Sequence, residues 1–235
     1  MNDSTLPEAA QADPGTATET AAATAPAPTA KKKQQRGARL PEVQPALEQL
    51  AGLYPQLFGA VFRPLKRGIF QDLLGAHPDQ FQRDTLKEAL AFHTRSTRYL
   101  TAVAAAQPRH DLQGKAVEPM APEHVHHALV EVFRRRQARS AEDLRPKLRE
   151  RIVQAFEASG LSREDYAHLV RGRDEAANAL LEEALAIAAE RRAKDEALLR
   201  AFEGGGGVSV EAFAEMYGLE PRAAAKALER ARRLR

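Results

Sequence analysis

Three clusters of cationic residues lie close together between residues 63 and 114 of the 235-residue chain. They read RPLKRGIFQDL at 63–73, TRSTRYL at 94–100 and RHDLQG at 109–114. In each cluster, aliphatic or aromatic residues alternate with the basic ones and can pack into a core, which would hold the cations in fixed positions. Because fixed lysine and arginine side chains bind phosphate groups, the clusters indicate a polyanion-binding surface.

The spacing of basic residues between the clusters agrees with this interpretation. Arg83 and Lys87 are about one helical turn apart, and Lys87 and Arg98 are about three turns apart. If one helix carried all three, they would share a face, with Arg95 nearby. Tyr99, beside Arg98, could stack on a base or hydrogen-bond to a sugar or a phosphate. On spacing alone, nucleic-acid binding and an ordinary solvated basic face explain the pattern equally well.

Charge is distributed unevenly along the chain, whose formal net charge is +3. Residues 1–30 hold four acidic and no basic residues, whereas residues 31–39 hold five basic and no acidic ones. The first segment, rich in Ala, Thr and Pro, is expected to be disordered. The second is either a solubilising linker or a non-specific phosphate-binding arm. Residues 141–235 are slightly acidic overall, so a polyanion site is expected before them.

Composition and motifs argue against an enzyme. The chain has no cysteine, its one run of glycines is not followed by Lys-Ser or Lys-Thr, and its carboxylates show no convergent pairing. His124, His126 and His127 have no cysteine to accompany them, and only the first and last share a helix face. Surface or capping roles are therefore expected rather than metal binding. We expect no catalytic residue, no metal site and no cofactor.

Sequence patterns favour a mainly α fold with a small β-hairpin. Apolar residues recur at helical spacing through most of the chain. Asp79 is the expected N-cap of a helix through residues 86–93, and Tyr99 either continues that helix or lies in a second short one. Alternating polar residues on both sides of Gly114 predict a hairpin within residues 107–120.

Residues 140–235 read as an all-helical extension. Gly160 ends one helix, Ser162 caps the next, and a long helix is expected over residues 174–203. Residues 208–235 have the pattern of a helix-turn-helix, which makes a DNA-binding regulator the alternative function. A helical hairpin that packs on the long helix, or on another subunit in a protein-interaction scaffold, explains the same pattern.

Several motifs between about residue 41 and residue 135 resemble the RNA-binding domain of the ProQ/FinO family of bacterial RNA chaperones. The motifs stand in the same order and at the same spacing as in that family. They are RPLKxGIxxDL from Arg63, LxxAL from Leu86, TxSxRYL from Thr94, RxDLxG from Arg109 and EHV from Glu123.

The resemblance implies a compact, mostly helical domain whose concave face binds structured RNA, preferring a stem followed by a single-stranded 3′ tail. Such a target suits a protein that reads backbone shape, 2′-hydroxyls and a free end, because A-form RNA hides its base edges in a narrow groove. With the residues chosen from spacing, the expected RNA-binding set is Arg63, Lys66, Arg83, Lys87, Arg95, Arg98, Tyr99 and Arg109.

The chain departs from the family pattern in two places. Ala91 occupies a position where family members carry a base, and Arg95, one turn on, could compensate. The helical extension is unlike the long basic linker and β-rich end domain of the best-known members, so the properties of that end domain are not transferred.

The expected function is a cytoplasmic RNA chaperone that acts by stoichiometric binding. It would stabilise small RNAs and mRNA 3′ ends and promote RNA–RNA pairing. The expected organisation is a tail over residues 1–39, an RNA-binding domain over 40–139, and an extension over 140–235 that is open to a protein partner or self-association. We expect neither a signal peptide nor a membrane-spanning helix.

Overall fold

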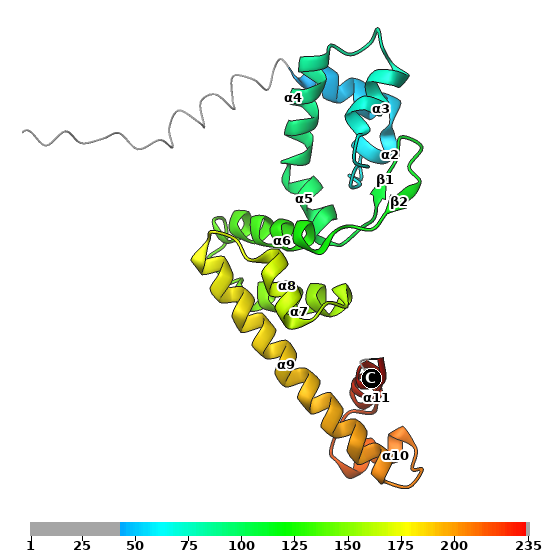
Figure 1. Ribbon diagram of the computed structural model, residues 1–235, viewed down its shortest axis with the longest axis vertical. Coiled ribbons are helices and arrows are strands. Elements are labelled where there is room, and N and C mark those ends of the chain that lie inside the picture. The colour runs from blue at the N-terminus through cyan, green and yellow to red at the C-terminus, as the bar shows by residue number, and fades with distance from the viewer. Residues whose placement is uncertain (1–42, 234–235) are drawn as a thin grey trace, which may run out of the picture. The chain divides into compact units, whose positions relative to one another are not determined.

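The computed structural model describes residues 43–233 (Figure 1). The predicted disordered tail and basic run over residues 1–39 lie outside this range. None of the helices between residues 43 and 233 combines the length and the apolar character that a membrane crossing needs. Residues 43–53 are helical, and the elements that follow are α2 (Pro55–Phe58), α3 (Ile69–Ala76), α4 (Arg83–Thr94), α5 (Thr97–Ala104), β1 (Arg109–His110), β2 (Ala116–Glu118), α6 (Pro122–Gln137), α7 (Arg145–Ser159), α8 (Arg163–Val170), α9 (Glu175–Gly204), α10 (Val210–Met216) and α11 (Pro221–Arg233).

The expected fold class is confirmed, because the described part of the chain is mainly helical with one small antiparallel sheet, β1 paired with β2. The hairpin predicted within residues 107–120 is therefore present. In its turn, the Asp111 carboxylate accepts hydrogen bonds from the backbone N–H groups of Gln113 and Lys115, at 3.1 and 2.9 Å. Gly114 follows with φ +75°, a left-handed conformation that glycine adopts without steric cost.

α4 begins later than the sequence predicted. Residues 78–80 form a turn, and Phe81 then enters the core with 7% of its surface exposed. Gln82 is the N-cap residue, in an extended conformation, so Asp79 does not cap this helix. The turn at residues 78–80 and the extended backbone at Gln82 delay the helix until Arg83, which is the physical reason for the correction.

α4 and α5 are two helices rather than one. The side chain of Ser96 accepts a hydrogen bond from the backbone N–H of Tyr99 at 3.2 Å and caps the start of α5. Residues 95 and 96, which we call the α4–α5 junction, stand between the two helices. Lys87 on α4 and Arg98 on α5 therefore do not share one continuous helix face, which their spacing predicts only for an unbroken helix.

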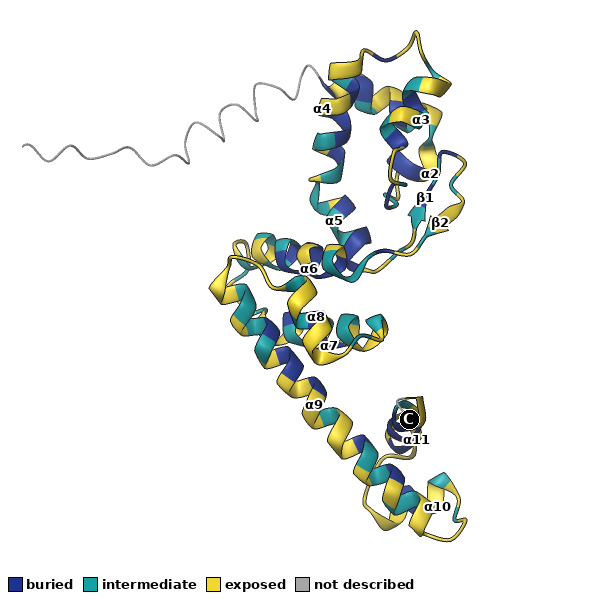
Figure 2. Cartoon of the chain, in the orientation of Figure 1, coloured by how far each residue is buried: buried dark blue, intermediate teal, exposed yellow. Residues whose placement is uncertain are grey.

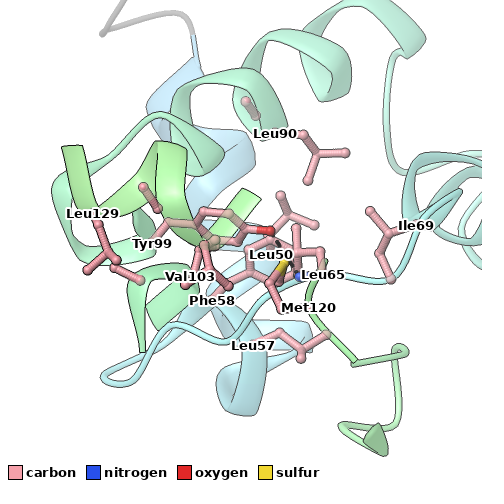
Figure 3. Close-up of a cluster of buried hydrophobic side chains, with 14 of the residues drawn as sticks. Leu50, Leu57, Phe58, Leu65, Ile69, Leu90, Tyr99, Val103, Met120 and Leu129 are labelled. Atoms are coloured by element: carbon pink, nitrogen blue, oxygen red, sulfur yellow. Dashed lines mark hydrogen bonds between the residues drawn. The ribbon is translucent and has the colours of Figure 1, made fainter. Parts of the chain in front are cut away.

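One connected core of buried apolar residues extends from the helix at 43–53 to α9 (Figure 2). Figure 3 shows its central part, where Leu65 and Tyr99 lie among side chains that include Leu50, Phe58 and Met120. Helices of the extension contribute to the same core through residues Leu148, Ile152, Val153, Tyr166, Leu181, Ala184, Leu185 and Ala188. The helices α7, α8 and α9 thus share a core with the helices that precede them.

A second, smaller buried cluster joins the end of α9 to α11 through Leu199, Leu228 and Ala231. Asp195 of α9, which is 6% exposed, forms a two-point ion pair with Arg230 of α11 at 2.8 and 2.9 Å. The pair of short helices predicted for the end of the chain is present as α10 and α11, and α11 packs on the long helix α9.

Candidate nucleic-acid interface

The three cationic clusters meet at the backbone around Leu65. Lys66 N–H donates to the carbonyl of His110 at 2.8 Å, and His110 N–H donates to the carbonyl of Pro64 at 2.8 Å. These two bonds form an isolated parallel bridge between Leu65 and His110. We call the bonded residues 64–66, 99, 109 and 110 the Leu65 bridge. It brings the first and third clusters side by side although they lie more than forty positions apart in sequence.

Tyr99 joins the second cluster to the Leu65 bridge. Its hydroxyl oxygen accepts a hydrogen bond from Leu65 N–H at 3.0 Å, and the residue is only 6% exposed (Figure 3). Burial raises the pKa of Tyr99 above its ordinary value of 10.0, which keeps the hydroxyl protonated. Of the two roles expected for Tyr99, stacking on a base is corrected, because the ring faces the core and leaves no open face for a base. A hydrogen bond from the hydroxyl to a sugar or a phosphate stays a prediction.

Arg109 and Arg63 are tied to backbone carbonyls rather than free in solvent. Arg109 Nη1 donates to the Leu65 carbonyl at 3.0 Å, and its Nε lies 3.4 Å from Glu118 Oε1 with the side chain 14% exposed. Arg63 Nη1 donates to the Gly114 carbonyl at 3.3 Å. Both guanidinium groups retain further N–H groups, so each adds a positive charge in a fixed position.

Lys66 is held by an acidic neighbour. Its Nζ donates to Asp72 Oδ2 at 2.8 Å, and the lysine side chain remains 39% exposed. This bond and the charge of Asp72 raise the pKa of Lys66 above 10.5. Gly68, with φ +83°, is the N-cap of α3 and turns the chain between the lysine and the aspartate. The ammonium group is thus charged and oriented at the edge of the Leu65 bridge.

The basic residues of α4 are exposed. Arg83 and Lys87 lie in successive turns, and the Arg83 guanidinium carbon is 6.0 Å from the centre of the Phe70 ring. Arg95, directly after α4, turns back along the helix, where its Nε donates to the Ala91 carbonyl at 2.7 Å. The Arg95 side chain thus lies against the backbone of Ala91, and its compensation for the missing base stays a prediction.

Arg98 is exposed but ordered. Its guanidinium carbon lies 4.5 Å from the centre of the Phe62 ring, and its Nη2 donates to the Ala60 carbonyl. The residue stands in the first turn of α5, where unpaired backbone N–H groups and the helix dipole also favour an anion. The contact with the Phe62 ring, the hydrogen bond to the Ala60 carbonyl and the place of Arg98 in the first turn together fix its positive charge beside the N-terminus of α5.

The structure thus divides the eight predicted residues into three groups. Arg83, Lys87, Arg95 and Arg98 are exposed cations, while Arg63, Lys66 and Arg109 are partly buried cations held by neighbours. Tyr99 is a buried support. Sequence reasoning missed Arg135 of α6, whose Nη1 donates to the Arg95 carbonyl at 2.9 Å. A run of three arginines at the end of a helix is typical of a favourable interaction with the helix dipole and gives no sign of this contact.

A mostly helical domain with fixed cations around a β-bridge is a domain suited to binding a polyanion. Comparison with known proteins gives its class: residues 40–145 match the ProQ/FINO family. This region of the chain belongs to that family, which confirms the resemblance drawn from the motifs.

Two curated relatives illustrate the match. The proteins named RNA chaperone ProQ from Aeromonas salmonicida (strain A449) and from Aeromonas hydrophila subsp. hydrophila are each 43% identical over 68 residues, which is 28% of this chain and 32% of the relative. The chain therefore spans about a third of the length of these relatives. A crystal structure of a FinO-like RNA chaperone from Neisseria meningitidis MC58 is 32% identical, covering 37% of this chain and 90% of that one with a TM-score of 0.34.

The hydrogen bond between Leu65 N–H and the Tyr99 hydroxyl is expected to stabilise the folded protein. Tyr99→Phe should lower the free energy of unfolding by about 2 kcal/mol, because it removes the acceptor for a buried N–H group and leaves that group unpaired. Unfolding in urea measures the change. Tyr217→Phe is the matched control, since Tyr217 is 52% exposed. Equal effects of the two substitutions would contradict the role assigned to the Tyr99 hydroxyl.

Proposed function

We propose that this protein is an RNA chaperone that binds structured RNA stoichiometrically through the surface around the Leu65 bridge. The observation that carries the proposal is the convergence of three separated cationic clusters on one hydrogen-bonded backbone bridge. The match to the ProQ/FINO family over the same residues supports RNA as the polyanion. The proposed targets are small RNAs and mRNA 3′ ends, which the protein would stabilise and bring together for RNA–RNA pairing.

The exposed cations and the partly buried cations held by neighbouring groups suit different parts of a structured RNA. The exposed side chains of Arg83, Lys87, Arg95 and Arg98 can follow the phosphates of an RNA stem, which presents mainly backbone to a protein. The held groups of Lys66 and Arg109 lie together at the Leu65 bridge and suit a single-stranded 3′ tail, whose flexible backbone needs fixed partners. Binding in this proposal involves no chemical step, in keeping with a chaperone rather than an enzyme.

The preference for a 3′ tail can be tested with two RNAs that share one hairpin, one with a single-stranded 3′ tail of uridines and one ending flush with the stem. The full chain should bind the tailed RNA more tightly, as measured by fluorescence anisotropy at several salt concentrations. A third RNA carrying the same tail at its 5′ end controls for length. Equal affinity for all three RNAs would refute the tail preference while leaving RNA binding itself in place.

The phosphate contacts can be tested by charge removal. Arg98→Ala and Lys87→Ala should each weaken binding and lower the slope of log affinity against log salt by about one unit, because one phosphate contact releases about one counterion. Lys194→Ala removes an exposed lysine of α9 that pairs with Glu190 and is the matched control. Unchanged slopes in both variants would place the phosphate contacts on another surface.

The comparisons give no support to the DNA-binding alternative for residues 208–235. A protein partner or self-association through residues 140–235, the boundary at residue 139 and a cytoplasmic location all stay predictions. So does the contribution of the basic run at 31–39. Because the DNA alternative depends on residues 208–235, a chain lacking them separates the two readings: retention of RNA binding favours the surface around the Leu65 bridge.

A further inference from the structure

Arg135 of α6 contacts the α4–α5 junction from outside the predicted RNA-binding set. Its Nη1 donates to the Arg95 carbonyl at 2.9 Å and to the Thr97 side-chain oxygen at 3.1 Å. The Arg95 carbonyl belongs to the α4–α5 junction, and Thr97 is the first residue of α5. The arginine therefore holds the end of one helix and the first residue of the next with a single nitrogen, across a separation of about forty residues in sequence.

The neighbours of Arg135 orient its side chain. Glu131, one turn earlier on α6, lies 3.7 Å from Arg135 Nη2 and also accepts a hydrogen bond from Arg134 at 2.8 Å. Arg134 in turn pairs with Asp174, the N-cap residue of α9. Arg134 thus contacts the start of α9 in the extension, whereas Arg135 contacts the α4–α5 junction. The Arg135 side chain is only 31% exposed.

The α4–α5 junction sets the direction of two exposed cations. Arg95 belongs to the junction, and Arg98 lies in the first turn of α5 directly after it. A short helix that begins after a break can rotate about that break, and α5 has only eight residues. A fixed donor between the two helix ends limits such rotation and so fixes where the two guanidinium groups point.

We propose that Arg135 is a positioning residue for RNA binding, whose guanidinium group holds the α4–α5 junction in the geometry that presents Arg95 and Arg98 to RNA phosphates. The inference rests on the proposed function. Arginine suits this role because its planar guanidinium presents several N–H groups in a rigid arrangement, whereas a lysine ammonium is a compact charge on a flexible stem. Geometry, rather than charge alone, is the property that matters here.

The test compares three variants of the full chain, Arg135→Lys, Arg135→Ala and Arg136→Ala, in binding to the tailed hairpin RNA at several salt concentrations. Arg135→Lys keeps the charge and loses the guanidinium geometry. Arg136 is the matched control, because it is exposed and lies next to Arg135 on α6. Circular dichroism melting of each variant shows whether it is folded at the temperature of the binding measurement.

Both substitutions of Arg135 should weaken binding about fivefold, which corresponds to the loss of one ordinary hydrogen bond, and should give the same salt slope as each other, because both disturb Arg95 and Arg98 alike. Arg136→Ala should bind as tightly as the unchanged chain. Full affinity in Arg135→Lys would overturn the inference, since charge alone would then suffice. A salt slope that falls by about one unit in Arg135→Ala but stays unchanged in Arg135→Lys would also overturn it, by indicating a direct phosphate contact of Arg135 itself. If the unchanged chain fails to bind the RNA, the proposed function fails instead.

Discussion

The protein is expected to lose much of its stability as the pH falls from neutral to about 4, because two histidines are buried without charge. His93 is 3% exposed and His126 is 6% exposed. Burial lowers the pKa of each to about 4 from the ordinary value of 6.5, with a smaller effect from Arg98 on His93 and from His127 on His126. Both groups are thus neutral in the folded protein near pH 7.

The sign of the effect follows from the two pKa values. Between about pH 6.5 and about pH 4 the unfolded chain binds a proton at each position and the folded chain does not, so protons favour unfolding. The stabilising contribution is complete above about pH 6.5 and is lost as the pH falls to about 4. It amounts to about 3 kcal/mol for each histidine at most, which is a large share of the stability of a typical domain.

Urea unfolding measured across this pH range checks the prediction. The His93 ring lies 4.7 Å from the Phe58 ring and 4.3 Å from the Phe62 ring, so His93→Phe keeps an aromatic side chain there and should flatten the pH dependence. His126→Phe should do the same beside Tyr166. His124→Gln, which removes an exposed histidine from α6, is the control. If all three variants change the pH dependence equally, burial is not its cause.

Ile152→Ala in α7 should lower the free energy of unfolding by about 3 kcal/mol. Ile152 has no exposed surface and belongs to the core that the extension shares with α2 to α6. Removing its side-chain methyl and methylene groups leaves a cavity in that shared core, so the loss should appear in the unfolding of α2 to α6 as well as in that of the extension.

The measurement needs a probe for each region. Protection of backbone amides from hydrogen exchange in α5 and in α7 should fall together in Ile152→Ala. Ile187→Ala is the matched control, because Ile187 is the same residue type on α9 and is 37% exposed. A loss of protection confined to α7, with α5 unchanged, would contradict a shared core.

Most helices could be predicted from the sequence because their signals are local. Gly160 ends α7 in a left-handed conformation, and Ser162 accepts a hydrogen bond from a backbone N–H three residues on, as their positions predicted. The hairpin around Gly114 follows from equally local turn chemistry. The sequence also predicts an apolar face on α7 and on α9. It does not predict which other helix packs against that face.

The arrangement of the candidate site could be predicted only in part. Order and spacing of the motifs indicated which segments carry the cations, and the structure brings those segments together. The direction of the Tyr99 ring could not be predicted, because it depends on an acceptor needed by Leu65, a residue 34 positions earlier. Arg135 was missed for the same reason, since its partners lie about forty positions away and leave no local mark in the sequence.

The Leu65 bridge also bears on when the protein becomes active during its synthesis. Its bonds join residues 64–66 to residues 99, 109 and 110, and β2 pairs with β1 only after residue 118 has been made. Domains fold as units while the ribosome releases the chain from its N-terminus. A nascent chain shorter than this therefore carries the cations of the first cluster without their fixed positions, and the proposed RNA capture begins only once the hairpin has left the ribosome.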